Sequence, residues 1–205
     1  TISSGSVSIG DTLELLPGKG KVRVRNIQSH GISVDTAFSG ERAAINLNNT
    51  ESNKLKRGYH ISKINTYSEI ESFVCEISTN STKKSKIKNN QRIRIHIGTR
   101  EVMGRVMIVE PNDNSIRIPA LIKLEKPIVA GRGDYFIIRS YSPVYTIGGG
   151  VIIDIPGKED WKELKNRILV LHNSPDEEKL YNIINNISSI NPLEMSDVEK
   201  RLNIS

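Results

Sequence analysis

The sequence predicts a mainly β protein: two consecutive small barrels or sandwiches, followed by an α-helical extension. Short runs in which apolar and polar residues alternate recur through the first 156 residues. Turns rich in Gly, Pro, Asn and Asp separate these runs, and helical spacing begins only after Pro156-Gly157. Many short strands without helical periodicity are typical of barrels and sandwiches.

Short strands joined by turns are predicted for residues 1–67. The turn Pro17-Gly18-Lys19-Gly20 separates two runs, and a polar loop spans Asn48 to Lys56. The predicted strands are Thr12–Leu16, Lys21–Ile27, Ala43–Leu47 and Tyr59–Ile64.

A second all-β unit is predicted for residues 68–156. Its candidate strands are Ser72–Ile77, Arg92–Ile97, Val102–Val109, Ser115–Ile118, Ala120–Leu124 and Tyr135–Ser140. Pro111-Asn112-Asp113-Asn114 is a predicted tight turn, and Pro127 marks a loop. The run Gly148-Gly149-Gly150 predicts either a tight turn or a close approach of two backbones.

The strand Arg92–Ile97 is the centre of a basic stretch. Its three isoleucines alternate with Arg92, Arg94 and His96, which gives one apolar face and one basic face. Between residues 83 and 105 the only acid is Glu101, and the basic residues are Lys83, Lys84, Lys86, Lys88, Arg92, Arg94, Arg100 and Arg105. A solvated strand face and a polyanion-binding site explain this pattern equally well.

Residues 157–205 change pattern. Trp161, Leu164, Ile168 and Leu171 have helical spacing, which predicts an amphipathic helix over Lys158–His172. Ser174-Pro175-Asp176-Glu177 is a strong start signal for a second helix. Met195-Ser196-Asp197 predicts a cap for a third, short helix that ends near Leu202.

The amino-acid composition and the net charge restrict the class of protein. The 205 residues include 29 basic and 23 acidic ones, and a net charge of +6 suits a nucleic-acid partner but also many ordinary proteins. Cys75 is the single cysteine, so the chain predicts no disulfide framework and fits a reducing, cytoplasmic location. No apolar run is long enough to cross a bilayer, so no membrane partner is expected. The sequence starts mid-pattern without Met, which suggests a piece of a longer protein.

The sequence contains no motif for catalysis. It has no GxxxxGK[ST] phosphate loop, no GxSxG elbow and no HExxH pair, and its four histidines are scattered. We therefore expect no catalytic residue, no metal site and no cofactor in this chain.

Several stretches together resemble the bacterial selenocysteine-specific translation elongation factors. The most specific is SPVYTIGGGVIID at Ser142–Asp154, followed by IHIGTREVMGRV at Ile95–Val106. GSVSIGDTLELLPGKGKVRVRNIQSHG at Gly5–Gly31, AFSGERAAINL at Ala37–Leu47 and RGYHI at Arg57–Ile61 fit more loosely.

This resemblance implies the following organisation. Residues 1–67 would be an N-terminally truncated domain II barrel, residues 68–156 a domain III barrel, and residues 157–205 a helical linker with the possible beginning of a winged-helix domain. A GTPase domain that binds GTP and Mg²⁺ would lie upstream. The implied partners are selenocysteyl-tRNA, the ribosome and, through further C-terminal domains, a messenger RNA hairpin. The implied function is delivery of selenocysteyl-tRNA to recoded UGA codons.

The resemblance also implies roles for individual residues. Arg42 matches a basic residue of the selenocysteine pocket, where a guanidinium would pair with the selenolate anion, and His30 would add a second donor. An ordinary rim arginine and a surface histidine are the competing interpretations. Domain III would contact the acceptor and T-stem side of tRNA mostly through phosphates. The residues expected to do so are Lys83, Lys84, Lys86, Lys88, Arg92, Arg94 and Arg100.

Two other functions stay open. The same barrels occur in other translational GTPases, against which the HIGT and TIGGG stretches argue. A DNA-binding regulator would read its target with the helical tail, although that tail is acidic at Asp176–Glu178.

Overall fold

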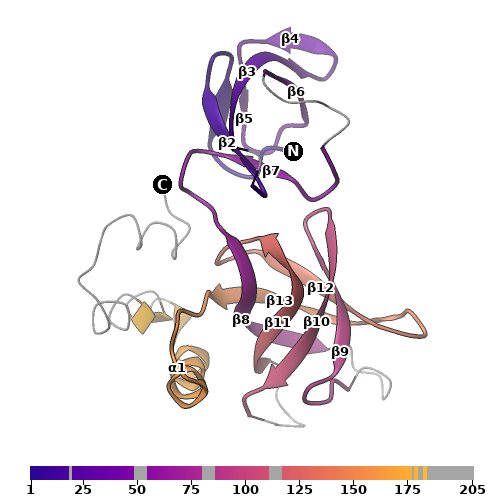
Figure 1. Cartoon of the computed structure of the whole chain (residues 1–205), viewed down its shortest axis with the longest axis vertical. Helices are drawn as coiled ribbons and strands as arrows, with labels where there is room; N and C mark the ends of the chain where they lie inside the picture. The colour runs from indigo at the N-terminus through magenta and orange to yellow at the C-terminus, as the bar shows by residue number, and fades with distance from the viewer. Residues whose placement is uncertain are drawn as a thin grey trace. The chain divides into compact units, whose positions relative to one another are not determined.

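The computed structural model describes residues 1–18, 20–48, 55–79, 86–110, 117–176, 178–179 and 182–183. The chain forms two compact units, residues 1–65 and 66–205 (Figure 1). Each unit is built mainly from antiparallel strands, and the second unit also contains helix α1. The mainly β prediction with a helical extension is confirmed.

The described residues of the first unit form seven strands. They are β1 (Ser6–Ser8), β2 (Thr12–Leu16), β3 (Gly20–Ser29), β4 (Ile32–Val34), β5 (Thr36–Phe38), β6 (Ala43–Asn48) and β7 (His60–Ser62). The larger sheet has the order β4-β3-β2-β7, with β6 also paired to β3, while β1 pairs with β5. Both sheets contribute to one core, with Val24 and Ile27 from β3 packing against Val7 and Ala37.

The second unit is a closed barrel with the strand order β10-β11-β8-β13-β12-β9. The strands are β8 (Glu69–Thr79), β9 (Arg92–Ile97), β10 (Arg100–Ile108), β11 (Ile118–Val129), β12 (Tyr135–Ser140) and β13 (Thr146–Asp154). In β9, Ile93 and Ile95 are fully buried and Ile97 is nearly so, while the residues between them reach the outside. The period-2 pattern therefore becomes one core-facing and one outward-facing side.

The triple glycine lies inside β13 and not in a turn. Gly148 pairs with Thr79 and Gly150 with Ile77 on the neighbouring strand β8. A Cβ atom at Gly148 would collide with the carbonyl oxygen of Ser78, and one at Gly150 with that of Glu76. The predicted turn is wrong, and the alternative of a close backbone approach is confirmed. The barrel closes here because glycine leaves room for the adjacent backbone.

A single long strand, β11, replaces the two strands and the loop that the sequence predicts between Ser115 and Pro127. Residues 111–116 lie outside the described part of the chain. From Ile118 onwards the strand continues past Leu124, with a register shift between Lys123 and Ile128 that accommodates Pro127. Proline lacks a backbone donor, and an irregularity of this kind lets it stay within a strand.

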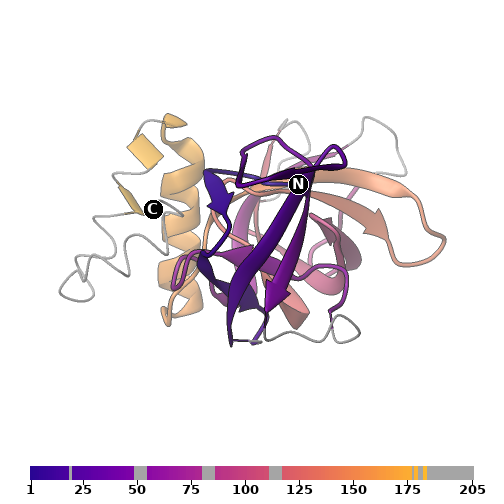
Figure 2. The ribbon, with the colours of Figure 1, turned by 90° about the horizontal axis from the view of Figure 1, so that it is seen from above.

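Helix α1 (Trp161–Asn173) packs on the outside of the barrel (Figures 1 and 2). The predicted helix is confirmed but starts three residues later, because Asp160 is its N-cap: Asp160 Oδ1 accepts from the Glu163 backbone N–H at 2.9 Å. The apolar stripe of the helix contacts barrel residues that face outwards. This second core consists of Val74, Val109, Leu121 and Ile153 with Leu164, Ile168, Leu171 and Ile183.

Part of the predicted second helix can be followed. The described residues 176, 178, 179, 182 and 183 are helical, and Ile183 is buried against α1 and the barrel. The predicted third helix, up to Leu202, lies outside the described residues. Within the described part of the chain, no helix has the length and apolarity needed to cross a membrane.

Candidate nucleic-acid interface

Cations from neighbouring strands form a row on the outer face of the barrel. On β9, Arg92 pairs with Arg105 of β10, and Arg105 pairs in turn with Lys123 of β11. Directly opposed residues have Cβ atoms about 4.5–5.5 Å apart, so three positive side chains lie side by side across three strands. Like charges at this spacing repel one another, and a bound polyanion would relieve the repulsion.

A second row lies two residue pairs further along the strands, on the same outer face. Arg94 of β9 is opposite Arg139 of β12 on one side and Met103 of β10 on the other. The outer face of four consecutive strands therefore has five basic side chains: Arg92, Arg94, Arg105, Lys123 and Arg139. We call this surface, together with its acidic partners, the basic face.

Two glutamates lie among these cations. Glu125 binds Arg92 with both oxygens: Nε donates to Oε1 at 2.6 Å and Nη2 to Oε2 at 2.8 Å. Glu101 pairs with Arg94, and its second oxygen lies 3.7 Å from His96 Nε2. The bond to Arg92 holds the pKa of Glu125 below its ordinary value, with nearby Arg105 adding to the effect. Arg92 and Arg94 are thus ion-paired arginines and not unpartnered phosphate ligands.

Exposed aromatic and aliphatic side chains border the basic face. Tyr141 follows β12, and its ring lies under the Arg92 guanidinium at 4.6 Å from Arg92 Cζ to the ring centroid. Tyr135 and Ile137 of β12 are also exposed, at 80% and 51%. A mixture of basic and aromatic side chains is typical of nucleic-acid-binding sheets.

The remaining predicted tRNA-binding residues are placed unevenly. Lys86 and Lys88 are exposed in the segment that leads into β9, and Arg100 begins β10 opposite Ile97. Lys83 and Lys84 lie outside the described residues. Of the predicted residues, the structure therefore brings only Arg92 and Arg94 into the two rows.

Sequence reasoning missed Lys123, Glu125, Arg139 and Tyr141. Their positions depend on which strands become neighbours across the barrel, and β9 pairs with β10 and β12. The alternation in Tyr135–Ser140 places Arg139 on the outer side, so this one residue had a usable signal. No such signal existed for Glu125, because this residue follows Leu124, the predicted end of its strand.

In the first unit, Arg42 and His30 lie at the same end of one ladder. Ser29 of β3 pairs with Ala43 of β6, and His30 and Arg42 are the residues immediately beyond this pair. Both side chains are exposed, and His30 occupies a left-handed turn with φ 54°. The structure thus brings together the two residues that the resemblance implies for the selenocysteine pocket.

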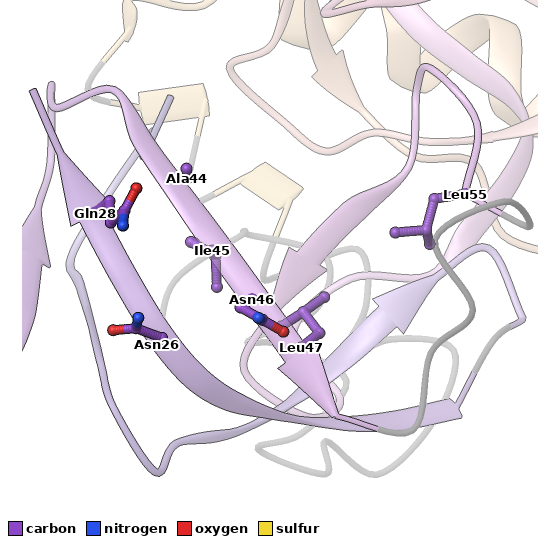
Figure 3. Close-up of a pocket in the computed structure, with 7 residues that line it drawn as sticks. All are labelled: Asn26, Gln28, Ala44, Ile45, Asn46, Leu47 and Leu55. Atoms are coloured by element: carbon purple, nitrogen blue, oxygen red, sulfur yellow. The ribbon is translucent and has the colours of Figure 1, made fainter. Parts of the chain in front are cut away.

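The outer side of this ladder borders an open groove of about 570 Å³ (Figure 3). Side-chain amides of Asn26 and Gln28 on β3 and Asn46 on β6 line it, and Leu55 contributes from beyond the ladder. Amides both donate and accept hydrogen bonds, and the remaining lining residues are apolar, so the groove offers an uncharged surface that is part polar and part apolar.

Neither a metal centre nor an activated thiol is seen in the described ranges. No group of three or more His, Cys, Asp or Glu side chains there has the geometry to hold a metal ion. Cys75 is fully buried in the barrel, and burial raises the pKa of its thiol well above the ordinary value. A protonated, inaccessible thiol is a poor nucleophile.

Comparison with solved structures defines the class of fold. The chain superposes with a TM-score of 0.78 on a bacterial selenocysteine-specific elongation factor, EF-Sec, at 23% identity, covering 98% of this chain and 32% of that one. The elongation factor SelB of Methanococcus maripaludis in its apo form gives 0.64 at 20% identity, over 78% of this chain and 39% of the other. The fold is that of translation elongation factor barrels.

Sequence comparison finds similarity to one family of elongation factors. Residues 75–159 match the family described as selenocysteine-specific elongation factor, beta-barrel domain. Relatives of that name come from Desulfomicrobium baculatum, 28% identical over 78% of this chain, and Escherichia coli K12, 25% identical over 75%. The barrel of the second unit thus matches this family, and the chain is similar to selenocysteine-specific elongation factors over 75–78% of its length. It covers 25% and 24% of the length of these two relatives.

Proposed function

We propose that this chain is the tRNA-binding portion of a selenocysteine-specific elongation factor. The observation that carries the proposal is the basic face on a barrel that matches this family, with Arg92, Arg105 and Lys123 in a row across three strands. The phosphate groups of a tRNA stem are a suitable partner, because the deep groove of A-form RNA hides its bases and favours recognition of shape and backbone.

The first unit would hold the aminoacyl end of the tRNA. Arg42 would pair with the selenolate of the bound amino acid, and His30, one residue beyond the same strand pair, would donate a hydrogen bond. A guanidinium stays charged at every relevant pH, so Arg42 can always attract an anion. The negative charge of the selenolate distinguishes selenocysteine from serine and from a protonated thiol. The amide-lined groove beside them would accept uncharged parts of the acceptor end.

None of these residues is proposed to bind or hydrolyse GTP. The SelB protein of Methanococcus maripaludis has been solved in complex with a GTP analogue. The present sequence contains no phosphate-loop motif, so we assign GTP and Mg²⁺ binding to a separate domain of the elongation factor. Delivery to the ribosome, and contact with a messenger RNA hairpin through further C-terminal domains, complete the proposed function in the cytoplasm.

The test is a binding titration of fluorescently labelled tRNA specific for selenocysteine, followed by anisotropy at several KCl concentrations. The double variant Arg92→Glu and Arg94→Glu should weaken binding at least about tenfold. Each lost phosphate contact should also flatten the log–log salt dependence by roughly 0.7–0.9.

The matched control is Lys165→Glu, which reverses an exposed cation on α1. It should leave the affinity within about twofold of wild type, since Lys165 belongs to α1 and not to the basic face, and salt screens exposed charges that the RNA does not contact. Unchanged affinity in the Arg92 and Arg94 variant, or an equal loss in the control, would refute a phosphate-binding role for the basic face.

A further inference from the structure

We propose that Glu125 is a positioning residue that sets the RNA specificity of the basic face. This inference rests on the proposed function, because it concerns how the same surface distinguishes one RNA from another. It assigns to an acidic residue a role in binding a polyanion.

The Arg92 guanidinium is fixed from two directions. Both Glu125 oxygens accept from it, at 2.6 Å from Nε and 2.8 Å from Nη2, and the Tyr141 ring lies against its plane at 4.6 Å. A bidentate carboxylate and a stacked ring together determine both the position and the tilt of a guanidinium. Glu125 uses two of the five N–H donors of an arginine, so it orients this side chain without using all its hydrogen-bonding capacity.

The contact is at the surface, where it contributes little to folding. The exposed fractions of the Arg92 and Glu125 side chains are 38% and 40%. Exposed ion pairs add little to stability, so folding alone does not explain an ion pair of such regular geometry. Its effect should appear instead when another anion approaches Arg92.

Glu125 also acts on the other cations of the row. Arg105 is close enough to lower the pKa of Glu125, and Lys123 precedes Glu125 by two residues on β11. With its one negative charge, the Glu125 carboxylate therefore lowers the net charge of the row from +3 to +2. It should lower the affinity of the basic face for every RNA through electrostatic repulsion.

The loss of affinity that Glu125 causes should differ from one RNA to another. A phosphate that meets the oriented edge of Arg92 gains a preformed donor and avoids the carboxylate. A phosphate arriving from another direction must displace Glu125 or lie against it. A fixed cation beside a fixed anion thus penalises backbones of the wrong shape more than the matching one, which is how repulsive elements produce specificity.

Glu101 lacks this geometry. Glu101 accepts one hydrogen bond from Arg94 Nη1 and lies 3.7 Å from His96 Nε2, and its side chain is 47% exposed. Glu101 therefore neutralises charge without fixing the plane of a guanidinium. The two glutamates offer a comparison between a screening anion and a positioning anion.

The experiment compares the affinities of the chain for a tRNA specific for selenocysteine and for an elongator tRNA, by anisotropy over a range of KCl. Glu125→Gln should strengthen binding of the elongator tRNA about threefold to tenfold and that of the selenocysteine tRNA by less than twofold, so that discrimination falls. Glu125→Asp retains the charge but shortens the side chain; it should lose discrimination without a general gain in affinity. Glu101→Gln should strengthen both complexes equally.

Glu71→Gln is the control for net charge, since Glu71 is an exposed acid of β8 on the same barrel. If Glu125→Gln leaves the ratio of the two affinities unchanged, or if Glu71→Gln alters the ratio as much, the inference is refuted. Arg92→Gln separates this failure from that of the proposed function. Should Arg92→Gln also leave the selenocysteine tRNA affinity unchanged, the basic face does not bind RNA at all.

Discussion

The second unit has two sets of ion pairs between arginine and carboxylate side chains, one exposed to solvent and one buried. On the basic face, the Arg92 and Glu125 side chains are 38% and 40% exposed. Beneath helix α1, Arg167 is 6% exposed, while its partners Asp154 and Glu159 are at 0% and 3%. The exposed pairs remain open to exchange with another anion, whereas the buried pairs are part of the fold.

The buried set joins α1 and the segment after it to the barrel at two points. Arg167 pairs with Asp154 at the end of β13 and donates to Glu159 at 2.6 Å. Glu76 on β8 accepts from Lys179 Nζ at 3.0 Å and from Arg117 Nη1 at 3.1 Å, and it lies 3.2 Å from His172 Nδ1. The helical segment is therefore fastened to the barrel by charge as well as by apolar packing.

The largest effect is expected from breaking the buried set. Arg167→Ala leaves the Asp154 and Glu159 carboxylates buried without their shared cation, which should cost about 3–5 kcal/mol of unfolding free energy. Urea denaturation followed by circular dichroism measures it, with Lys165→Ala on the exposed side of α1 as the control. A loss below about 1 kcal/mol would mean that the buried pairs do not fasten the helix.

A substitution in β13 tests the barrel itself. Gly148→Ala places a methyl group against the Ser78 carbonyl of β8, so the two strands must separate. Overpacking of this kind costs about 1–3 kcal/mol, measurable as a lower urea midpoint. Gly157→Ala is the control, since a Cβ there meets nothing closer than 3.9 Å. Equal midpoints for the two variants would contradict the close approach.

The pH dependence of stability should report the Lys179 contacts. Burial by itself lowers the pKa of Lys179, but hydrogen bonds to Asp176 and Glu76 outweigh it and raise the pKa above 10.5. A raised lysine pKa stabilises the fold below the unfolded value of about 10.4, and this contribution disappears as the pH rises through the folded value. Lys179→Gln should therefore differ most from wild type at pH 9 and least at pH 12. A gap that is constant between these pH values would contradict the contacts.

The smallest effect on stability is expected on the basic face. Glu125→Gln removes an exposed ion pair and should leave the thermal midpoint equal to that of wild type within error. Differential scanning calorimetry in low and high salt makes the measurement. A clear drop in the midpoint would place Arg92 and Glu125 with the buried pairs and would weaken the argument for exchange with phosphate.

Local patterns predicted much of this fold, and long-range partners explain what they missed. Alternation in Arg92–Ile97 was enough to predict β9 and its two faces, because a strand has a strict period of two. The triple glycine fitted a turn as well as a close backbone approach, because the backbone of β8 that requires glycine here lies about seventy residues earlier in the chain. Asp154, Arg167 and Glu76 gave no local signal, since their partners come from other elements.

The candidate site was predicted in the same uneven way. Counting charges along the chain found Arg92 and Arg94, and the resemblance pointed to Arg42 and His30. Neither approach could find Glu125, because it reaches Arg92 only after β9, β10 and β11 have come together in the barrel. Which of these residues contact RNA stays a prediction.

The most direct test of the basic face is a lysine footprint on the unmodified chain. Amine acetylation is measured by mass spectrometry with and without tRNA specific for selenocysteine. The proposal predicts that bound tRNA protects Lys88 and Lys123, beside β9 and on β11, while Lys162 and Lys165 on α1 react as before. Protection of the α1 lysines with none at Lys88 and Lys123 would contradict RNA binding by the basic face.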